Sequence, residues 1–267
     1  MQIVTLIENM VYDQGLTAEH GLSLYLESGN KKIVFDTGQT GNFVNNAVRL
    51  GVDISTVTDL VISHGHYDHT GGILNFIKNN NHAKIHIKRQ AFIKKYRTNK
   101  TDSIGIPFDP DFISERINFI DKKTEISSGV FIMPEIIIYE PEDLHYDGMF
   151  IKNADQFIPD KFDDELFLAV VNEEKLTIVS GCSHNGIINI CETAANQLNL
   201  KFNTILGGFH LMNSNEAHIR LLSEYFKKIN PEKIGVCHCT GIDKFAILKN
   251  ILGKKVFYNY TGKKIII

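Results

Sequence analysis

The chain has 267 residues, of which 43% are hydrophobic and 22% charged, the composition of an ordinary globular protein. Its length is enough for one large hydrophobic core and does not require a second domain. A formal net charge of −3 gives no electrostatic basis for nucleic-acid binding, and no apolar run reaches the length of a membrane span. Four cysteines are too few for a disulfide framework, and the first residues lack signal-peptide features. We therefore expect a cytoplasmic protein with reduced thiols.

The first part of the chain predicts strands interspersed with two helices. Strands are expected at 2–8, 21–28, 32–36, 59–62 and 84–88. Helices are expected at about 41–50 and near 73–79. The segment Ser28-Gly29-Asn30-Lys31 favours a hairpin turn between the second and third strands.

Residues from about 89 to 160 are less regular, because prolines interrupt the pattern. A helix is expected at 91–97, with strands near 117–120 and 130–139. We interpret 89–160 as an insertion-like excursion from the main scaffold, near the active site. Loops on a rigid frame carry specificity, so substrate choice is expected there.

Regular structure is again expected from residue 164 onward. Strands are expected at 166–171, 175–179, 204–206, 233–237, 256–258 and 263–267. Helices are expected at 186–198, at 242–252, and from a capping-box-like segment at 213–216 to about Ile229. Strands come first and then alternate with helices in two similar halves. This order predicts two mixed sheets packed face to face with helices outside, in one domain over 1–267.

The segment richest in candidate metal ligands follows the expected strand at 59–62 and reads Ser63-His64-Gly65-His66-Tyr67-Asp68-His69-Thr70-Gly71-Gly72. Imidazole and carboxylate are the usual nitrogen and oxygen ligands of zinc and related ions. His64 and His66 alternate and project the same way from an extended segment. Asp68 and His69 are adjacent and would diverge, which suits two neighbouring ions better than one. The segment therefore predicts a metal site at the carboxyl end of a strand.

The glycines of this segment have expected roles. Gly65 would leave space beside the metal, and Gly71 and Gly72 would let the chain turn sharply into the next helix.

Three later strands each end near a histidine, at His184, His210 and His238. We predict His184 and His238 as metal ligands. For His210 two roles stay open: a ligand, or a donor of a hydrogen bond or proton to the substrate. The remaining histidines are expected to be structural or on the surface: His20, His82, His86, His145 and His218.

Other polar residues near strand ends have two interpretations each. Cys182 is either a zinc ligand or a small buried residue, with packing slightly favoured. Cys237 and Cys239 flank His238 and are expected to point away from it as packing thiols. Asp36 either fixes the orientation of a ligating histidine or begins a turn. The pair Asp163-Asp164 either forms a turn or reaches the site.

With these residues in hand, the chain resembles the metallo-β-lactamase superfamily. The superfamily signature matches His64-x-His66-x-Asp68-His69, and its earlier strand-end aspartate matches Asp36. The resemblance covers nearly the whole chain. It implies an α+β fold, the αββα sandwich of two mixed sheets flanked by helices, with a dinuclear metal site that usually holds zinc.

Several segments are similar to a narrower prokaryotic branch of metal-dependent hydrolases, in which some members are named dihydropterin–ribofuranosylaminobenzene-phosphate synthases. The segments are 35–38, 63–72, 181–184, 207–211 and 238–241. The aspartate that commonly bridges the two metals follows a glycine at a strand end. Here Gly181 is followed by Cys182.

The resemblance implies a metal-dependent hydrolase that acts on a small ester, lactone or phosphodiester, with a phosphorylated substrate among the candidates. The implied ligand sets are His64, His66 and His184 for one ion, and Asp68, His69 and His238 for the other. Zn²⁺ is the expected cofactor, with iron and manganese open as alternatives. Asp68 would also hold the nucleophilic water, and His210 would protonate the leaving group or polarise the substrate.

Two other functions stay open. One is a synthase that condenses a dihydropterin with a ribofuranosylaminobenzene phosphate, and the other is a metal-dependent metabolite sensor without turnover. A redox di-iron role is less expected, since His66 stands where such enzymes tend to use a carboxylate. The expected partner is a small-molecule substrate, with no nucleic acid and no membrane, and a homo-oligomer is left open.

Overall fold

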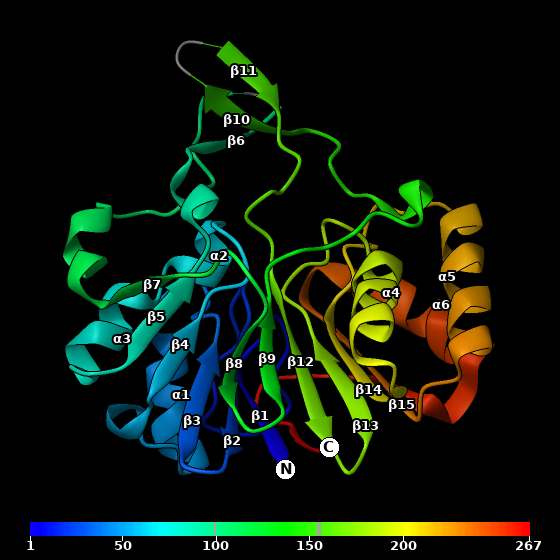
Figure 1. Ribbon diagram of the computed structural model, residues 1–267, viewed down its shortest axis with the longest axis horizontal. Coiled ribbons are helices and arrows are strands. Elements are labelled where there is room, and N and C mark those ends of the chain that lie inside the picture. The colour runs from blue at the N-terminus through cyan, green and yellow to red at the C-terminus, as the bar shows by residue number, and fades with distance from the viewer. Residues whose placement is uncertain (99, 154–155) are drawn as a thin grey trace.

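The computed structural model describes residues 1–98, 100–153 and 156–267, which form two seven-stranded mixed sheets packed face to face (Figure 1). The first sheet has the order β17 (Lys264–Ile266), β1 (Gln2–Ile7), β2 (Ser23–Ser28), β3 (Lys31–Phe35), β4 (Asp59–Val61), β5 (Lys84–Ile87) and β7 (Ile117–Phe119). The second has the order β16 (Val256–Tyr258), β15 (Lys233–Cys237), β14 (Lys201–Gly208), β13 (Lys175–Val179), β12 (Phe167–Asn172), β9 (Val130–Met133) and β8 (Thr124–Ser127).

Helices cover the outer face of each sheet. The first sheet carries α1 (Asn42–Leu50) and α3 (Ile73–Asn79), with the one-turn α2 (Tyr67–Thr70) beside them. The second carries α4 (Ile187–Leu198), α5 (Glu216–Ile229) and α6 (Ile242–Leu252). Short 3-10 turns occupy η1 (Ile54–Thr56), η2 (Arg89–Phe92), η3 (Pro110–Arg116), η4 (Pro141–Asp143), η5 (His238–Thr240) and η6 (Gly253–Lys255).

Three apolar clusters hold these four layers together. Side chains such as Leu24 and Phe35 from the first sheet meet Ile132 and Leu168 from the second in the space between the sheets. The other two clusters lie between each sheet and its own helices. The predicted sandwich of two mixed sheets with helices outside is confirmed. In the part of the chain that the structure describes, no helix is long and apolar enough to cross a membrane.

The stretch 89–160, expected as one excursion, is divided between two places. Its strands β7, β8 and β9 extend the two main sheets. Only β6 (Lys95–Arg97), β10 (Met149–Asn153) and β11 (Gln156–Pro159) stand apart, as a small antiparallel sheet above the end of the sandwich (Figure 1). The helix expected at 91–97 is wrong: η2 is followed by β6, because Lys95 to Arg97 pair with β10.

Two further boundaries differ from expectation for local reasons. The strand expected at 130–139 ends at Met133, because Pro134 has no backbone N–H to continue a ladder. The segment at 213–216 does not form a capping box. Asn215 is the N-cap of α5, and its side chain accepts a hydrogen bond from the backbone N–H of His218.

Buried Lys95 ties the small sheet to the rest of the molecule. Its Nζ atom lies 2.6 Å from Asp160 Oδ2 and 2.9 Å from Asp164 Oδ1. The other carboxylate oxygen of Asp164 accepts a 2.7 Å hydrogen bond from the backbone N–H of Gly65. Asp164 therefore reaches the histidine-rich loop, through that loop's backbone.

Candidate metal centre

The histidine-rich loop lies at the edge where the parallel strands of both sheets end. Residues 63–69 follow β4 and Asp36 follows β3, whereas residues 182–184, His210 and His238 follow β13, β14 and β15. Parallel neighbours end at the same edge of a sheet. Face-to-face packing of the sheets then brings together residues that are far apart in the sequence.

One set of three imidazoles gathers at this edge. His64, His66 and His184 each present a ring nitrogen, and these atoms lie within 4.8 Å of one another. The Nε2 atoms of all three are buried, and no partner for them is present among the described residues. Buried polar atoms are normally hydrogen-bonded, so three converging nitrogens without a partner have the arrangement expected of a cation-binding site.

The surroundings keep this first set neutral and fixed. Burial lowers the pKa of His66 to about 3, and lowers the pKa values of His64 and His184 well below the usual range of histidine. Neutral imidazole is the form that binds metal. The Nδ1 atom of His64 lies 2.9 Å from Ser63 Oγ, and the ring of Phe162 stacks on His184 with centroids 3.7 Å apart.

A second set forms beside the first from Asp68, His69 and His238. His238 Nε2 lies 3.2 Å from His69 Nε2 and 3.3 Å from Asp68 Oδ2. Burial alone would lower the pKa of His69, but the carboxylates of Asp36 and Asp68 raise it to about 9. An ion bound here would displace that proton, because metal and proton compete for the same nitrogen.

In the second set, the Nδ1 atom of each imidazole contacts a side-chain oxygen. Asp36 Oδ2 lies 2.7 Å from His69 Nδ1, and its Oδ1 accepts a 2.7 Å bond from the backbone N–H of Ser63. Asn9 Oδ1 lies 2.9 Å from His238 Nδ1. Such partners fix which nitrogen faces the metal. Of the two roles expected for Asp36, its contact with His69 favours the one in which it orients a histidine of the candidate site.

His210 lies next to the first set, with its ring centroid 4.3 Å from that of His184. Its Nδ1 atom is buried and has no partner in the described part of the chain. Cys182 and Cys239 lie close to it. Cys239 does not point away as expected, because the chain turns at His238, where φ is 50°, instead of continuing as a strand.

The two sets open into a pocket of about 530 Å³. Its walls include Asp68, Cys182, His184, His210 and His238. Its mouth is lined by Tyr67, Arg97, Thr98, Gly148, Met149 and Met212. The small sheet that holds Arg97 and Met149 therefore borders the site. Four of the six residues predicted as ligands line this pocket together with His210: His66, Asp68, His184 and His238. The other two do not line it but adjoin these residues, His64 beside His66 and His184, and His69 beside His238.

A family model described as the metallo-beta-lactamase superfamily matches residues 16–192. The chain belongs to the metallo-beta-lactamase superfamily. The matched stretch contains the first set of imidazoles whole, and ends before His210 and His238. Proteins of this superfamily typically bind divalent metals, and the candidate ligand clusters described above are consistent with that property.

Individual relatives span almost the whole length of this metallo-beta-lactamase protein. An uncharacterized protein of Methanocaldococcus jannaschii is 29% identical over 266 residues, 98% of each chain. From the same organism, 7,8-dihydropterin-6-methyl-4-(β-D-ribofuranosyl)-aminobenzene-5'-phosphate synthase is 27% identical over 90% of this chain and 88% of its own. A crystal structure of a metal-dependent hydrolase of the beta-lactamase superfamily superposes with a TM-score of 0.88, at 30% identity, over 100% of this chain and 99% of that chain.

Within the metallo-beta-lactamase fold, the signature glycines act differently from expectation. None of Gly65, Gly71 and Gly72 adopts a positive φ. They allow close packing instead: a Cβ on Gly65 would lie 2.2 Å from the carbonyl oxygen of Ala91, and one on Gly72 would lie 2.3 Å from that of Thr37.

The other histidines divide into three groups. His82 is exposed, and His86 is buried beside Asp59, with His86 Nε2 2.7 Å from Asp59 Oδ1, as expected of surface and structural residues. His145 and His218 form a further cluster with Asp143. His20 is one of the residues that sequence reasoning missed, since its Nε2 lies 3.0 Å from Asp68 Oδ2. It comes from the loop between β1 and β2, with no strand end to mark it.

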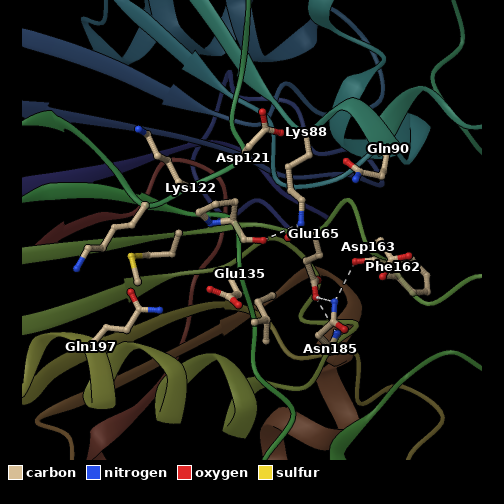
Figure 2. Close-up of a pocket in the computed structure, with 14 residues that line it drawn as sticks. Lys88, Gln90, Asp121, Lys122, Glu135, Phe162, Asp163, Glu165, Asn185 and Gln197 are labelled. Atoms are coloured by element: carbon tan, nitrogen blue, oxygen red, sulfur yellow. Dashed lines mark hydrogen bonds between the residues drawn. The ribbon is translucent and has the colours of Figure 1, made fainter.

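A separate pocket of about 490 Å³ lies behind the first set, and none of the predicted ligands lines it (Figure 2). Glu165 and Asn185 form part of its wall, with Asn185 Nδ2 2.9 Å from Glu165 Oε2. The same carboxylate accepts a 2.7 Å bond from the backbone N–H of His184. Burial raises the pKa of Glu165 to about 7. This pocket therefore borders residues that support the backbone of His184.

Proposed function

We propose that this protein is a metal-dependent hydrolase whose two side-chain sets hold divalent ions. The observation that best supports this is the convergence of three buried, unpartnered Nε2 atoms, from His64, His66 and His184. A hydrophobic or purely structural role would leave each of these atoms without a hydrogen bond, at a cost of about 1–3 kcal/mol apiece. A cation satisfies all three at once.

In this proposal His64, His66 and His184 hold one ion, and Asp68, His69 and His238 hold the other. Nitrogen-rich sites of this kind suit zinc, which when bound supplies Lewis acidity and lowers the pKa of a water to about 7. Asp36 and Asn9 keep the second set turned toward the pocket, through the Nδ1 atoms of His69 and His238.

The protein's own groups provide the proton transfers. Asp68 is buried and carries a carboxylate at the pocket wall, so it accepts a hydrogen bond from the attacking water and orients it. His210 has a free Nδ1 next to the first set, and from there it donates a proton to the leaving group.

The substrate of this proposal is a small ester, lactone or phosphodiester, with a phosphorylated compound favoured. A pocket of about 530 Å³ has the size of a small-molecule site. Arg97 at the mouth offers a positive charge to an anionic group. The name of the 27% identical relative also contains a phosphate ester. A cytoplasmic location, with reduced cysteines, is part of the same proposal.

Metal analysis is the direct test. Protein purified without chelator should contain close to two equivalents of zinc by mass spectrometry, and His64→Ala should lose much of it, whereas exposed His82→Ala should not. The loaded protein should then hydrolyse members of a lactone and phosphodiester panel, and Asp68→Ala should not. Failure to bind metal under replete conditions would overturn the proposal.

A synthase is the second candidate, because the named relative carries that activity in its name. Incubation of the metal-loaded protein with an activated dihydropterin and a ribofuranosylaminobenzene phosphate tests it by mass spectrometry. A condensed product, without turnover of the hydrolysis panel, would replace the hydrolase proposal.

A further inference from the structure

We infer that Asp143, His145 and His218 form a binding site for a structural zinc ion, separate from the candidate metal centre. None of the three lines either of the two pockets described above. Asp143 ends η4, His145 follows in the loop that leads to β10, and His218 lies in the first turn of α5. The ion joins that loop to α5. The inference goes beyond the proposed function and does not depend on it.

The three side chains converge on one place. Each offers one ligand atom, and these atoms all lie within 4.8 Å of one another. Asp143 Oδ1 lies 2.8 Å from His218 Nε2. Two imidazoles and one carboxylate supply three of the four ligands of a tetrahedral zinc site, and water completes the fourth position.

His145 supplies the observation that points to a bound ion. Its Nε2 atom is buried and has no hydrogen-bond partner among the described residues. The backbone of His145 is fixed, because its N–H donates a 2.9 Å bond to the carbonyl oxygen of His184. Its ring centroid lies 5.1 Å from that of His218. A buried ring nitrogen without a partner, close to a carboxylate, is an arrangement that a cation satisfies.

The carboxylate of Asp143 also lacks a permanent positive charge beside it. The residue is fully buried, and its Oδ2 accepts a 2.7 Å bond from the backbone N–H of Ile188. In the part of the chain that the structure describes, its ion-pair partner is His218, which is charged only when protonated, and not a lysine or arginine. Buried charges in proteins are usually paired or bound to metals. A water could satisfy the nitrogen of His145 but would add no charge, so a cation fits better.

Neighbouring groups hold these side chains in position. Ser214 Oγ lies 3.0 Å from His218 Nδ1, while the Nε2 atom of the same ring faces Asp143. Such a contact on one nitrogen of a histidine fixes which nitrogen faces a metal. A Cβ on Gly186 would lie 2.5 Å from Asp143 Oδ2, so glycine lets the chain before α4 pack against this carboxylate. The ligands are therefore already arranged for the ion.

A second buried pair, Asp59 and His86, shows how this protein satisfies the same groups without an ion. Asp59 Oδ2 lies 2.8 Å from Lys31 Nζ, and its Oδ1 lies 2.7 Å from His86 Nε2. The other ring nitrogen of His86 lies 2.9 Å from Asn118 Nδ2. Within the described residues, the site around Asp143 has no such lysine, and one of its ring nitrogens has no partner.

Zinc counting and anomalous diffraction together test the site. Zinc added at micromolar concentration, beyond the two equivalents proposed for the metal centre, should bind as one further equivalent by native mass spectrometry. Crystals of the full chain grown with that zinc should show an anomalous peak between Asp143, His145 and His218. His218→Ala should lose the peak and the further equivalent, with at least about 100-fold weaker binding there. Exposed His82→Ala and the matched buried variant His86→Gln should keep both.

Each outcome decides a different point. A peak at the set of His64, His66 and His184 alone would overturn this inference and leave the metal-centre proposal standing. A peak at the new site alone would support the inference and overturn the metal-centre proposal. A peak that needs millimolar zinc would mark an adventitious ion only, and would overturn the inference.

A second variant keeps the test decisive if His218→Ala does not fold. His145→Gln removes the ring but keeps the backbone N–H that contacts His184. It should also lose the further equivalent of zinc. Retention of that equivalent in this variant would overturn the inference.

Discussion

At the residue scale, one buried carboxylate fixes the orientation of an imidazole ring in the candidate metal centre. Asp36 is buried and left-handed at φ 60°, and its two oxygens contact the ring of His69 and the backbone and hydroxyl of Ser63. It would therefore act on the candidate metal centre through its neighbours, since it does not line the pocket itself.

Asp36→Asn should weaken the second set selectively. Asparagine keeps the shape, but it replaces one accepting oxygen with a donating amide, so His69 Nδ1 loses its partner or changes tautomer. We expect a loss of about 10- to 100-fold in zinc affinity for the weaker-bound equivalent. Competition with a chromophoric chelator measures it. Exposed Asp121→Asn is the control, and equal affinities in both variants would contradict the role.

A carboxylate remote from the pocket predicts how stability depends on pH. Asp59 Oδ2 lies 2.8 Å from Lys31 Nζ, and its Oδ1 lies 2.7 Å from His86 Nε2. Burial alone would raise the pKa of Asp59, but the hydrogen bonds from His86 and Lys31 lower it to about 2. Because the pKa is lowered in the folded state, the stabilisation is present above about pH 4 and is lost as the pH falls toward 2.

Asp59→Asn should therefore cost about 2 kcal/mol in the free energy of unfolding near pH 6, with the gap to wild type closing below pH 4. Urea unfolding at several pH values measures it. Glu232→Gln, which breaks the exposed contact to Lys175, should change nothing measurable. A gap for Asp59→Asn that stays constant down to about pH 3 would show that the loss is not electrostatic.

At the scale of elements, the sequence pattern alone was sufficient to predict the bounds of several helices and strands. The expected bounds of α3, α6, β15 and β16 agree with the structure within a residue. The strands β6, β10 and β11 were missed, since they have only three, five and four residues, and β6 pairs with β10 across about fifty residues of chain. No local pattern encodes that pairing.

The small sheet depends on one buried cation. Lys95→Met would leave Asp160 and Asp164 buried without their partner, which costs roughly 3–5 kcal/mol. Urea unfolding should show this loss, and exposed Lys94→Met should show almost none. Equal stability of the two variants would mean that the carboxylates find other partners.

The hairpin between β12 and β13 offers a stabilising change. Glu173 and Glu174 form its turn with φ values of 49° and 58°, a conformation that Asn-Gly adopts with less strain. Replacing Glu173 by Asn and Glu174 by Gly should raise the free energy of unfolding by about 1 kcal/mol. Metal content should stay unchanged, because the turn lies at the opposite end of β13 from Cys182. A lower melting temperature would contradict the turn assignment.

At the scale of the whole molecule, the candidate site lies where strand ends from the two sheets come together. The motif at 64–69 could be found from the sequence because its candidate ligands are close together in the chain. His184 and His238 could be proposed from their strand ends, but their distances to that motif depend on how the sheets pack. Asn9, His20 and Cys239 could not be found, because loops and a turn bring them in without any periodic signal.

Removal of the metal should therefore lower the stability of the whole folded protein. A ligand that binds only the folded state stabilises it by RT ln(1 + [L]/Kd), about 4 kcal/mol at a thousand-fold excess over Kd. A chelator should lower the melting temperature of the wild-type protein, and zinc should restore it. His64→Ala should respond much less. An unchanged wild-type melting temperature would mean that the bound metal contributes nothing to folding.

The link from Lys95 through Asp164 to the backbone of Gly65 also limits how this scaffold can be re-engineered. The small sheet beside the pocket and the loop that carries the candidate ligands are joined by one set of ionic contacts, from Lys95 to Asp164 and from Asp164 to the backbone of Gly65. Grafting a different sheet in its place, to change substrate preference, would disturb the ligand loop unless Lys95 and its two carboxylates were transplanted with it. A change made in the small sheet would therefore also act on the loop that carries the candidate ligands.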